Sequence, residues 1–237
     1  GIIGLVLLPI IGWGFHSKAD MAHAASAEPE TARKLQPGVT SLRRALLSPQ
    51  FIKLALAAFL FSVFVLGMVS NMVPVMSSLG FGRTEAAAIA GALGIGSFTG
   101  RMVTGYLIDR FNSSMIAGSL VLLPVISCLL LLNVDGSALV ASVAVLIFGL
   151  ALGAEVDVVA FLAAEKFGTA RFGTIFSFIN SGWTLATAVG PLLISLSYDL
   201  TSNYELAIQI AIPAFVVVSL LLFTIGKPLP FDEAAQA

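Results

Sequence analysis

Hydrophobic positions fall into six long runs separated by short polar turns, after a shorter apolar segment at the start of the chain. The long runs cover residues 51–77, 84–107, 114–133, 137–161, 174–198 and 204–226. A helix rises about 1.5 Å per residue, so about 20 apolar residues cross the roughly 30 Å hydrocarbon core of a bilayer. The pattern therefore predicts six membrane-spanning helices, and the short connections predict that consecutive helices are antiparallel neighbours.

The remaining segments differ from these runs. Residues 1–13 are apolar but too few for a span, and we interpret them as the end of a truncated helix of a longer protein. Residues 14–49 hold both histidines, five Lys or Arg residues and a stretch rich in Ala, Glu and Pro. They are too poor in apolar residues to bury a core, which predicts a linker. Residues 50–226 then form the six-helix unit, and residues 227–237 form a tail.

The composition supports a multi-pass membrane protein and excludes several other classes. The chain is 58% hydrophobic and 11% charged, with a mean hydropathy of +1.00, which a soluble protein of this length does not show. A net charge of -1 without a basic patch argues against nucleic acid as a partner. No histidine lies in a run, and no metal-ligand spacing or phosphate-binding glycine loop occurs, so we expect no catalytic residue, metal or cofactor.

Basic residues predict the orientation in the membrane, because Lys and Arg are enriched on the cytoplasmic side. If residues 14–49 are cytoplasmic, alternation places every Lys and Arg except Arg83 inside, eleven of the twelve, when Arg101 is counted with the turn it approaches. We therefore expect a plasma-membrane protein with the linker and the C-terminus in the cytoplasm.

Arg101 is the first candidate for a binding site, because it lies within the second apolar run. It is about six residues, or ~9 Å, from the predicted cytoplasmic end, and shares a face with Gly94, Ser97, Thr104 and Gly105. These small neighbours leave room for water or a ligand, and an arginine facing lipid is costly, so we expect this face to point inward. The alternative is that the side chain bends toward the interface.

Two carboxylates in the fourth run are candidates for proton coupling or ion pairing. Glu155 and Asp157 are separated by about 200° around a helix, so they face different partners. Glu155 lies near the depth of Arg101 on a helix that runs in the same direction, which predicts an Arg101–Glu155 ion pair. Asp157 lies nearer the headgroups, where an ordinary interfacial ion pair explains it equally well.

Polar side chains in two other runs are weaker candidates. Asn71 in the first run and Asn180 in the fifth, the latter with Trp183 and Thr184 nearby, are interpreted as possible substrate contacts. Polar contacts between helices explain them as readily. Prolines 74, 191 and 213 are expected to disturb their helices.

Two stretches resemble a known transporter family. "GRMVTGYLIDRF" resembles the loop motif in the second half of the major facilitator superfamily, here Gly105, Asp109 and Arg110. "GAEVDVVAFLAAEKFGTARFGTIFS" is similar to a run in bacterial members of its monocarboxylate and oxalate/formate-like branch. The resemblance implies an all-α fold, the C-terminal six-helix bundle of a twelve-helix transporter plus the end of helix six, with the N-terminal half missing from this chain. It also implies a bacterial inner membrane. We expect a gating role for the loop on separate grounds, because Asp109 at the cytoplasmic end of its helix is disfavoured by the helix dipole unless it meets the positive N-terminus of a neighbouring helix in the outward-facing state.

The resemblance implies that Arg101 binds a carboxylate, because that branch has such an arginine four residues before the glycine of the motif. Ser97 stands where animal monocarboxylate porters have an aspartate, so a proton-linked role must lie elsewhere, on Glu155, or be absent. No lysine occurs between Thr174 and Tyr198, which argues against a dianion. The motif also ends in Asn112 and two serines rather than glycine and basic residues.

We therefore expect a lipid-embedded secondary transporter of small organic monocarboxylate anions, working by alternating access with protons as the coupling ion. Two alternatives remain open at this point. One is a drug or sugar exporter of the same superfamily, and the other is a receptor or scaffold that does not transport.

Cysteines introduced at Ser26 and Gln236 test the predicted orientation. Both should be shielded from a membrane-impermeant thiol reagent in intact cells and should react after permeabilisation. A cysteine at Ser78, beside the turn that carries Arg83, is the external control and should react without permeabilisation. Labelling of Ser26→Cys and Gln236→Cys from outside would overturn the orientation.

Overall fold

The structure, a computed structural model, describes residues 39–226 and is helical throughout its regular elements. The helices are α4 (Val39–Leu46), α5 (Pro49–Ser70), α6 (Met72–Ser78), α7 (Arg83–Ile108), α8 (Ser113–Val121), α9 (Leu123–Leu132), α10 (Ala138–Phe167), α11 (Thr169–Thr201) and α12 (Glu205–Phe223). These helices form six segments that are long and apolar enough to cross a membrane: α5, α7, α10, α11 and α12 each form one, and α8 and α9 together form another. The predicted all-α fold with six spans is confirmed.

Residues 1–38 and 227–237 lie outside the described residues, so the truncated helix, the tail and most of the predicted linker are not part of this description. The end of that linker is helical, because α4 covers residues 39–46. Arg43 and Arg44 are exposed on α4, whereas Ala45 is fully buried. A short helix with one buried side therefore precedes the first span.

The connection between α10 and α11 differs from the predicted turn at residues 162–173. Here α10 continues to Phe167 and α11 begins at Thr169, so Gly168 alone separates them. Gly168 has φ +77°, a conformation that glycine adopts without the steric cost of a Cβ atom. The polar residues on both sides are compatible with a helix, and the two helices extend beyond the apolar runs that marked them in the sequence.

Prolines affect the helices unequally. The first span breaks at Asn71, three residues before Pro74, because the proline ring removes a backbone donor and disfavours the preceding helical turn. Pro124 has the same effect between α8 and α9, which the sequence reasoning missed. In contrast, α11 and α12 continue through Pro191 and Pro213, so the disturbance expected there does not end either helix.

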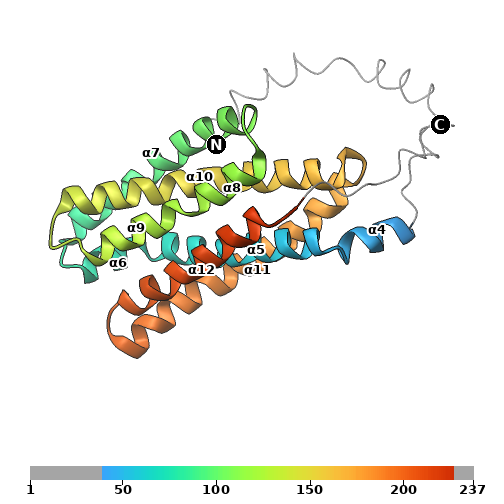
Figure 1. The fold of residues 1–237 in the computed structure, drawn as a ribbon. Helices are drawn as coiled ribbons and strands as arrows, with labels where there is room; N and C mark the ends of the chain where they lie inside the picture. The colour runs from blue at the N-terminus through green and yellow to red at the C-terminus, as the bar shows by residue number, and fades with distance from the viewer. Residues whose placement is uncertain (1–38, 227–237) are drawn as a thin grey trace, which may run out of the picture. The chain divides into compact units, whose positions relative to one another are not determined.

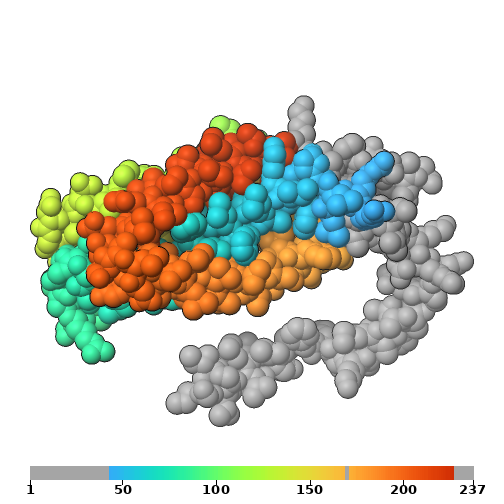
Figure 2. Space-filling model, turned by 90° about the horizontal axis from the view of Figure 1, so that it is seen from below, coloured from blue at the N-terminus to red at the C-terminus, as the bar shows by residue number. Residues whose placement is uncertain are grey.

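Helices α5 and α10 form the centre of the bundle. Helix α10 packs along α7 and against α9, while α11 packs along α5, and α12 covers α5 and α8 (Figure 1). Figure 2 shows α12, α5 and α11 side by side on one face. In the most apolar stretch of α5 and of α10, 50% of residues are buried, against 22% for α7 and for α11. Each of these two helices therefore has an open side.

Glycines allow α7 and α10 to approach each other closely. A Cβ atom added to Gly100 would lie 2.1 Å from the carbonyl oxygen of Leu150, and one added to Gly153 would lie 2.0 Å from that of Ser97. Both distances are far below van der Waals contact. Small residues at this spacing let helix backbones meet in a membrane, where apolar surfaces gain little from association.

Gly100→Ala tests this contact. The added methyl group meets backbone atoms of α10 and cannot be accommodated by a side-chain rotation, so we expect a loss of roughly 1–3 kcal/mol. Gly94→Ala is the matched control on the same helix, because nothing lies within 4 Å of its added Cβ. Thermal denaturation of the purified protein in detergent should show a lower midpoint for Gly100→Ala alone. Equal midpoints for the two variants would contradict the close packing.

Candidate functional site

An open cleft of about 820 Å³ lies between α7, α10 and α11, with Leu66 of α5 contributing to its wall. Apolar side chains of α10 and α5 form part of the lining. The polar and aromatic side chains come mainly from α7 and α11: Ser97, Arg101, Glu155, Asn180, Trp183, Thr184 and Thr187. Among the residues that line the cleft, Arg101 and Glu155 are the charged types.

Arg101 lines the cleft from α7. Its Nε atom lies 3.5 Å from Oδ2 of Asp157 on α10. The two side chains are 58% and 41% exposed, so this ion pair is accessible to solvent or to a ligand. The guanidinium group is therefore held at the edge of the cleft by one weak partner.

The predicted Arg101–Glu155 ion pair is wrong, since Arg101 pairs with Asp157. Positions 149, 153 and 157 of α10 are four residues apart and lie on one face of the helix. Gly149 and Gly153 of that face contact α7 directly, so Asp157 is also directed toward α7. The spacing of the glycines in the sequence was the signal that could have identified the partner.

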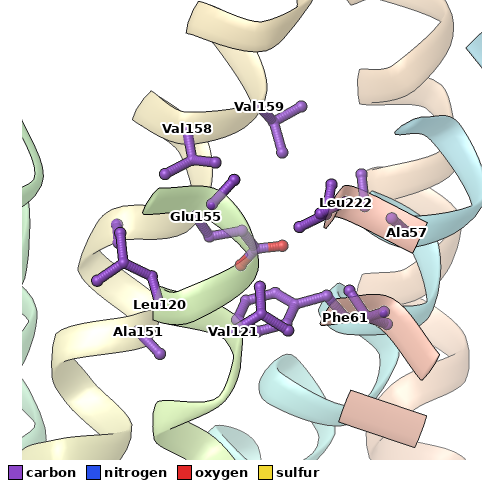
Figure 3. A pocket seen from close by; sticks show the side chains of 13 residues that line it. Ala57, Phe61, Leu120, Val121, Ala151, Glu155, Val158, Val159 and Leu222 are labelled. Carbon is purple, nitrogen blue, oxygen red and sulfur yellow. The ribbon is translucent and has the colours of Figure 1, made fainter. Parts of the chain in front are cut away.

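Glu155 faces the interior of the bundle on another side of α10. Its side chain is 6% exposed and its carboxyl group is hydrogen-bonded to the hydroxyl of Ser62 on α5. It also borders a small, otherwise apolar cavity of about 20 Å³, where it lies between Phe61, Val121 and Leu222 (Figure 3). Ser62 was missed in the sequence, although it is a single hydroxyl residue within the apolar stretch "FLFSVFV".

Helix α11 supplies a row of neutral polar groups. Asn180, predicted as a substrate contact, lines the cleft together with Trp183, Thr184 and Thr187. The hydroxyl of Thr184 donates to the carbonyl oxygen of Asn180 at 3.1 Å, and that of Thr187 donates to the carbonyl oxygen of Trp183 at 3.0 Å. The threonine oxygens therefore keep lone pairs that can accept hydrogen bonds from the cleft.

Asn71 does not line the cleft. Its amide donates to the carbonyl oxygen of Gly67 at 3.0 Å, and its Oδ1 atom accepts from Ser195 of α11 at 3.2 Å. The residue is 8% exposed and occupies the break between α5 and α6. The structure therefore favours the alternative interpretation of Asn71 as a polar contact between helices.

The predicted gating loop lies at the end of α7 and outside the cleft. Asp109 and Arg110 are exposed, and Asp109 forms the C-cap of α7. The guanidinium group of Arg110, in the turn after α7, lies 4.6 Å from the ring centre of Tyr106 in the last turn of α7, a cation–π contact. Gly105 is exposed on the same turn. A gating role for these residues stays a prediction.

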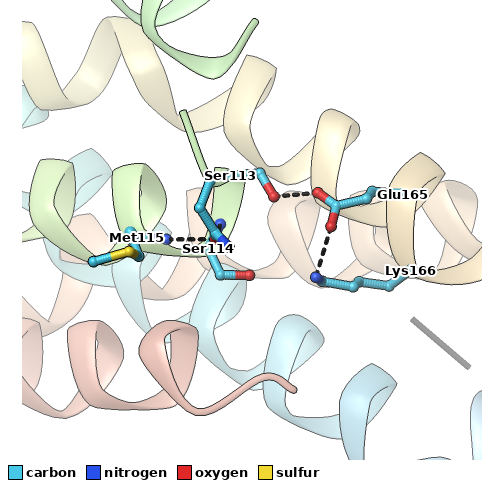
Figure 4. A network of polar contacts seen from close by, with 6 residues as sticks. Ser113, Ser114, Met115, Glu165 and Lys166 are labelled. Atoms are coloured by element: carbon cyan, nitrogen blue, oxygen red, sulfur yellow. Dashed lines mark hydrogen bonds and ion pairs between the residues drawn. The ribbon is translucent and has the colours of Figure 1, made fainter. Parts of the chain in front are cut away.

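A separate polar network joins the start of α8 to the end of α10. Glu165 accepts from Lys166 Nζ at 2.8 Å and from the hydroxyl of Ser113 (Figure 4). The side chain of Lys166 is 5% exposed, whereas that of Glu165 is 32% exposed. The buried ammonium group makes this ion pair more desolvated than the pair of Arg101 and Asp157.

Six membrane-length helices, some of which line a cleft with polar and charged walls, define an integral, multi-pass membrane protein. Residues 1–191 match the sequence profile of the Major Facilitator Superfamily, so the chain belongs to this superfamily of membrane transporters. A comparison with curated proteins finds no match. The protein is therefore a membrane transporter that sits in a lipid bilayer and acts on a small-molecule substrate.

The two ion pairs differ in burial, which predicts different costs of removing them. Asp157→Asn breaks an exposed pair and should change the free energy of unfolding by only ~0.2–1 kcal/mol, less at high salt. Glu165→Gln removes the charge beside a buried ammonium group and should cost more, about 1–3 kcal/mol. Denaturation in detergent at low and high salt measures both effects. A larger loss for Asp157→Asn than for Glu165→Gln would contradict this reading.

Proposed function

We propose that the protein transports small organic monocarboxylates by alternating access, with Arg101 as the carboxylate-binding residue. The observation that supports this most is the lining of the cleft, where Arg101 is the cationic residue and the opposite wall carries neutral amide, hydroxyl and indole groups. A planar guanidinium group binds a carboxylate through two parallel hydrogen bonds. The single guanidinium group among the described lining residues can bind one carboxylate, and the rest of a small substrate would contact the neutral groups. This favours a monocarboxylate as the substrate.

Asp157 acts in this proposal as an internal counter-ion for Arg101. Its carboxylate has the same chemistry as the substrate's carboxylate, and it holds the guanidinium at 3.5 Å in the described structure. An incoming monocarboxylate competes for the same donors. Because the pair is exposed and weak, its displacement costs little.

Glu155 is the proposed proton-coupling group. It lines the cleft that contains Arg101, yet its side chain is almost fully buried. An isolated carboxylate is costly in an apolar environment, and protonation removes that cost. Binding of a proton at Glu155 and of an anion at Arg101 would keep the net charge of the site constant during transport, which favours coupled movement.

The exposed sides of the six-helix unit indicate where another part of the transporter packs against it. Helices α7 and α11 bury little of their surface and both border the cleft. We propose that a second six-helix half of the transporter covers this side and completes the pathway. In this proposal the protein lies in the plasma membrane, with residues 14–49 and the tail on the cytoplasmic side. The loop at Asp109 and Arg110 then lies at the cytoplasmic end of the transport pathway, where it acts as a gate.

A neutral substrate such as a sugar, carried by an exporter of the same superfamily, is the second candidate. Trp183 offers an aromatic surface, and Asn180 with two threonines offers hydrogen-bonding groups. This set suits a hydroxylated ligand with an apolar face. Uptake assays separate it from the anion proposal, and they also separate both from a receptor that does not transport.

Substitutions at Arg101 and Asp157 test the anion site in the complete protein reconstituted in vesicles. Arg101→Lys keeps the charge but loses the bidentate geometry, so affinity for lactate, pyruvate or acetate should fall about tenfold or more. Asp157→Asn removes the competing carboxylate and should raise affinity up to about fivefold. The corresponding amides are control ligands whose binding should respond to neither change. Wild-type affinity in Arg101→Lys would place the anion site elsewhere.

Glu155→Gln tests the coupling. Exchange of labelled for unlabelled monocarboxylate should continue, because the neutral amide resembles the protonated acid. Accumulation driven by an imposed pH gradient should be lost, since the glutamine binds no proton. If Glu155→Gln still accumulates substrate on the pH gradient, the coupling carboxylate is another residue. The same accumulation assay on Asp157→Asn then tests whether that residue is Asp157.

A further inference from the structure

The hydroxyl of Ser62 lies between two oxygen atoms. Its Oγ is 2.6 Å from the carbonyl oxygen of Ala58, one turn earlier on α5, and is also hydrogen-bonded to Oε1 of Glu155 on α10. Ser62 is fully buried and Glu155 nearly so. Bulk water therefore does not take the place of either partner.

Counting hydrogen atoms constrains the protonation of this group. A serine hydroxyl has one proton to donate, and a backbone carbonyl oxygen only accepts. If Ser62 donates to Ala58 alone, its hydrogen bond with Glu155 needs a proton from Glu155, which is then a carboxylic acid. If Glu155 is ionised, Ser62 must donate to it, and the hydroxyl oxygen then faces the carbonyl oxygen of Ala58 without a proton between them.

The surroundings of Glu155 favour the neutral acid in this conformation. The small cavity beside it is lined from α5, α8, α10 and α12 by apolar side chains, and its volume of about 20 Å³ has room for one water molecule. On α7, Arg101 is engaged by Asp157. Helix α11 contributes Asn180, Trp183 and the two threonines to the shared cleft, all neutral. The charged groups of α5 and α12 that lie within the described helices, Lys53 and Glu205, are near the helix ends.

We propose that Ser62 and Glu155 form a two-state proton site, in which the Ser62 hydroxyl turns between the carbonyl oxygen of Ala58 and the Glu155 carboxylate as Glu155 binds and releases its proton. In the first state the acid donates to Ser62 and Ser62 donates to Ala58. In the second state Ser62 donates to the carboxylate. This assigns Ser62 as the positioning residue for the proton-coupling role proposed for Glu155, and it rests on that proposal only for its link to transport.

The rotation of the hydroxyl needs no change in the backbone. Within the helix, the carbonyl oxygen of Ala58 also accepts the backbone N–H of Ser62, so it keeps a partner when the hydroxyl turns away. The carboxylate gains a hydrogen bond to its charged form, which is about twice as strong as a bond between neutral groups. Ser62 therefore stabilises the ionised state more than the protonated state.

Infrared spectroscopy tests the protonation state without any substrate. The purified protein at neutral pH should show the C=O stretching band of a buried carboxylic acid, and Glu155→Gln should lack it. Ser62→Ala should retain the band at a higher frequency, because the acid has lost its acceptor. Ser127→Ala is the matched control: Ser127 is also fully buried and donates to a carbonyl oxygen, of Ala144 at 2.6 Å, but contacts no carboxyl group in the described structure.

The pH dependence of the band tests the switch itself. In Ser62→Ala the pH dependence of the acid band should differ from that of the wild type, because the carboxylate has lost its donor. Ser62→Thr keeps the hydroxyl and should restore the wild-type profile, and Ser127→Ala should not move it. If the wild-type protein has no acid band at neutral pH, or if Ser62→Ala titrates as the wild type does, the two-state site is wrong. If the band behaves as expected but no monocarboxylate is transported, the proposed substrate fails while the proton site stands.

Discussion

The hydrocarbon core of a bilayer provides no partner for a polar group, and this constraint accounts for most of the structure. Backbone donors and acceptors are satisfied within continuous helices, and isolated serines and threonines donate to carbonyl oxygens one turn earlier. The amide of Asn71 contacts backbone and a serine where the first span breaks. The two carboxylates of α10 obey the same constraint, each by a different route.

Asp157 and Glu155 are two residues apart in the sequence but have different environments. Asp157 lies at the open side of α10, where a guanidinium group balances its charge. Glu155 lies two residues earlier but faces the interior, where a serine hydroxyl and apolar side chains surround it. Rotation along one helix thus places an exposed anion and a buried acid on opposite sides of the same backbone. In the proposed mechanism, one rigid helix therefore connects the anion site and the proton site.

The sequence predicted the spans well, because run length and hydropathy report directly on membrane thickness. The break before Pro74 was also predictable, since the loss of a backbone donor is a local property. The partner of Arg101 was predicted incorrectly, because depth in the membrane was considered without the face of α10 that the glycines direct toward α7. Ser62 was not found, because the contact joins residues 93 positions apart and depends on which sides of α5 and α10 meet.

Gly168 links the two longest helices in the described part of the chain, so a rotation at this residue would displace distant parts of either helix. A single residue with φ +77° joins α10 to α11, so the angle between these helices depends on very few backbone dihedrals. Asn180 lies twelve residues along α11, or about 18 Å from this joint. A rotation of about 10° at Gly168 would move Asn180 by about 3 Å, roughly the length of one hydrogen bond. A small torsional change at this end of the bundle would therefore be enough to make or break a contact across the cleft.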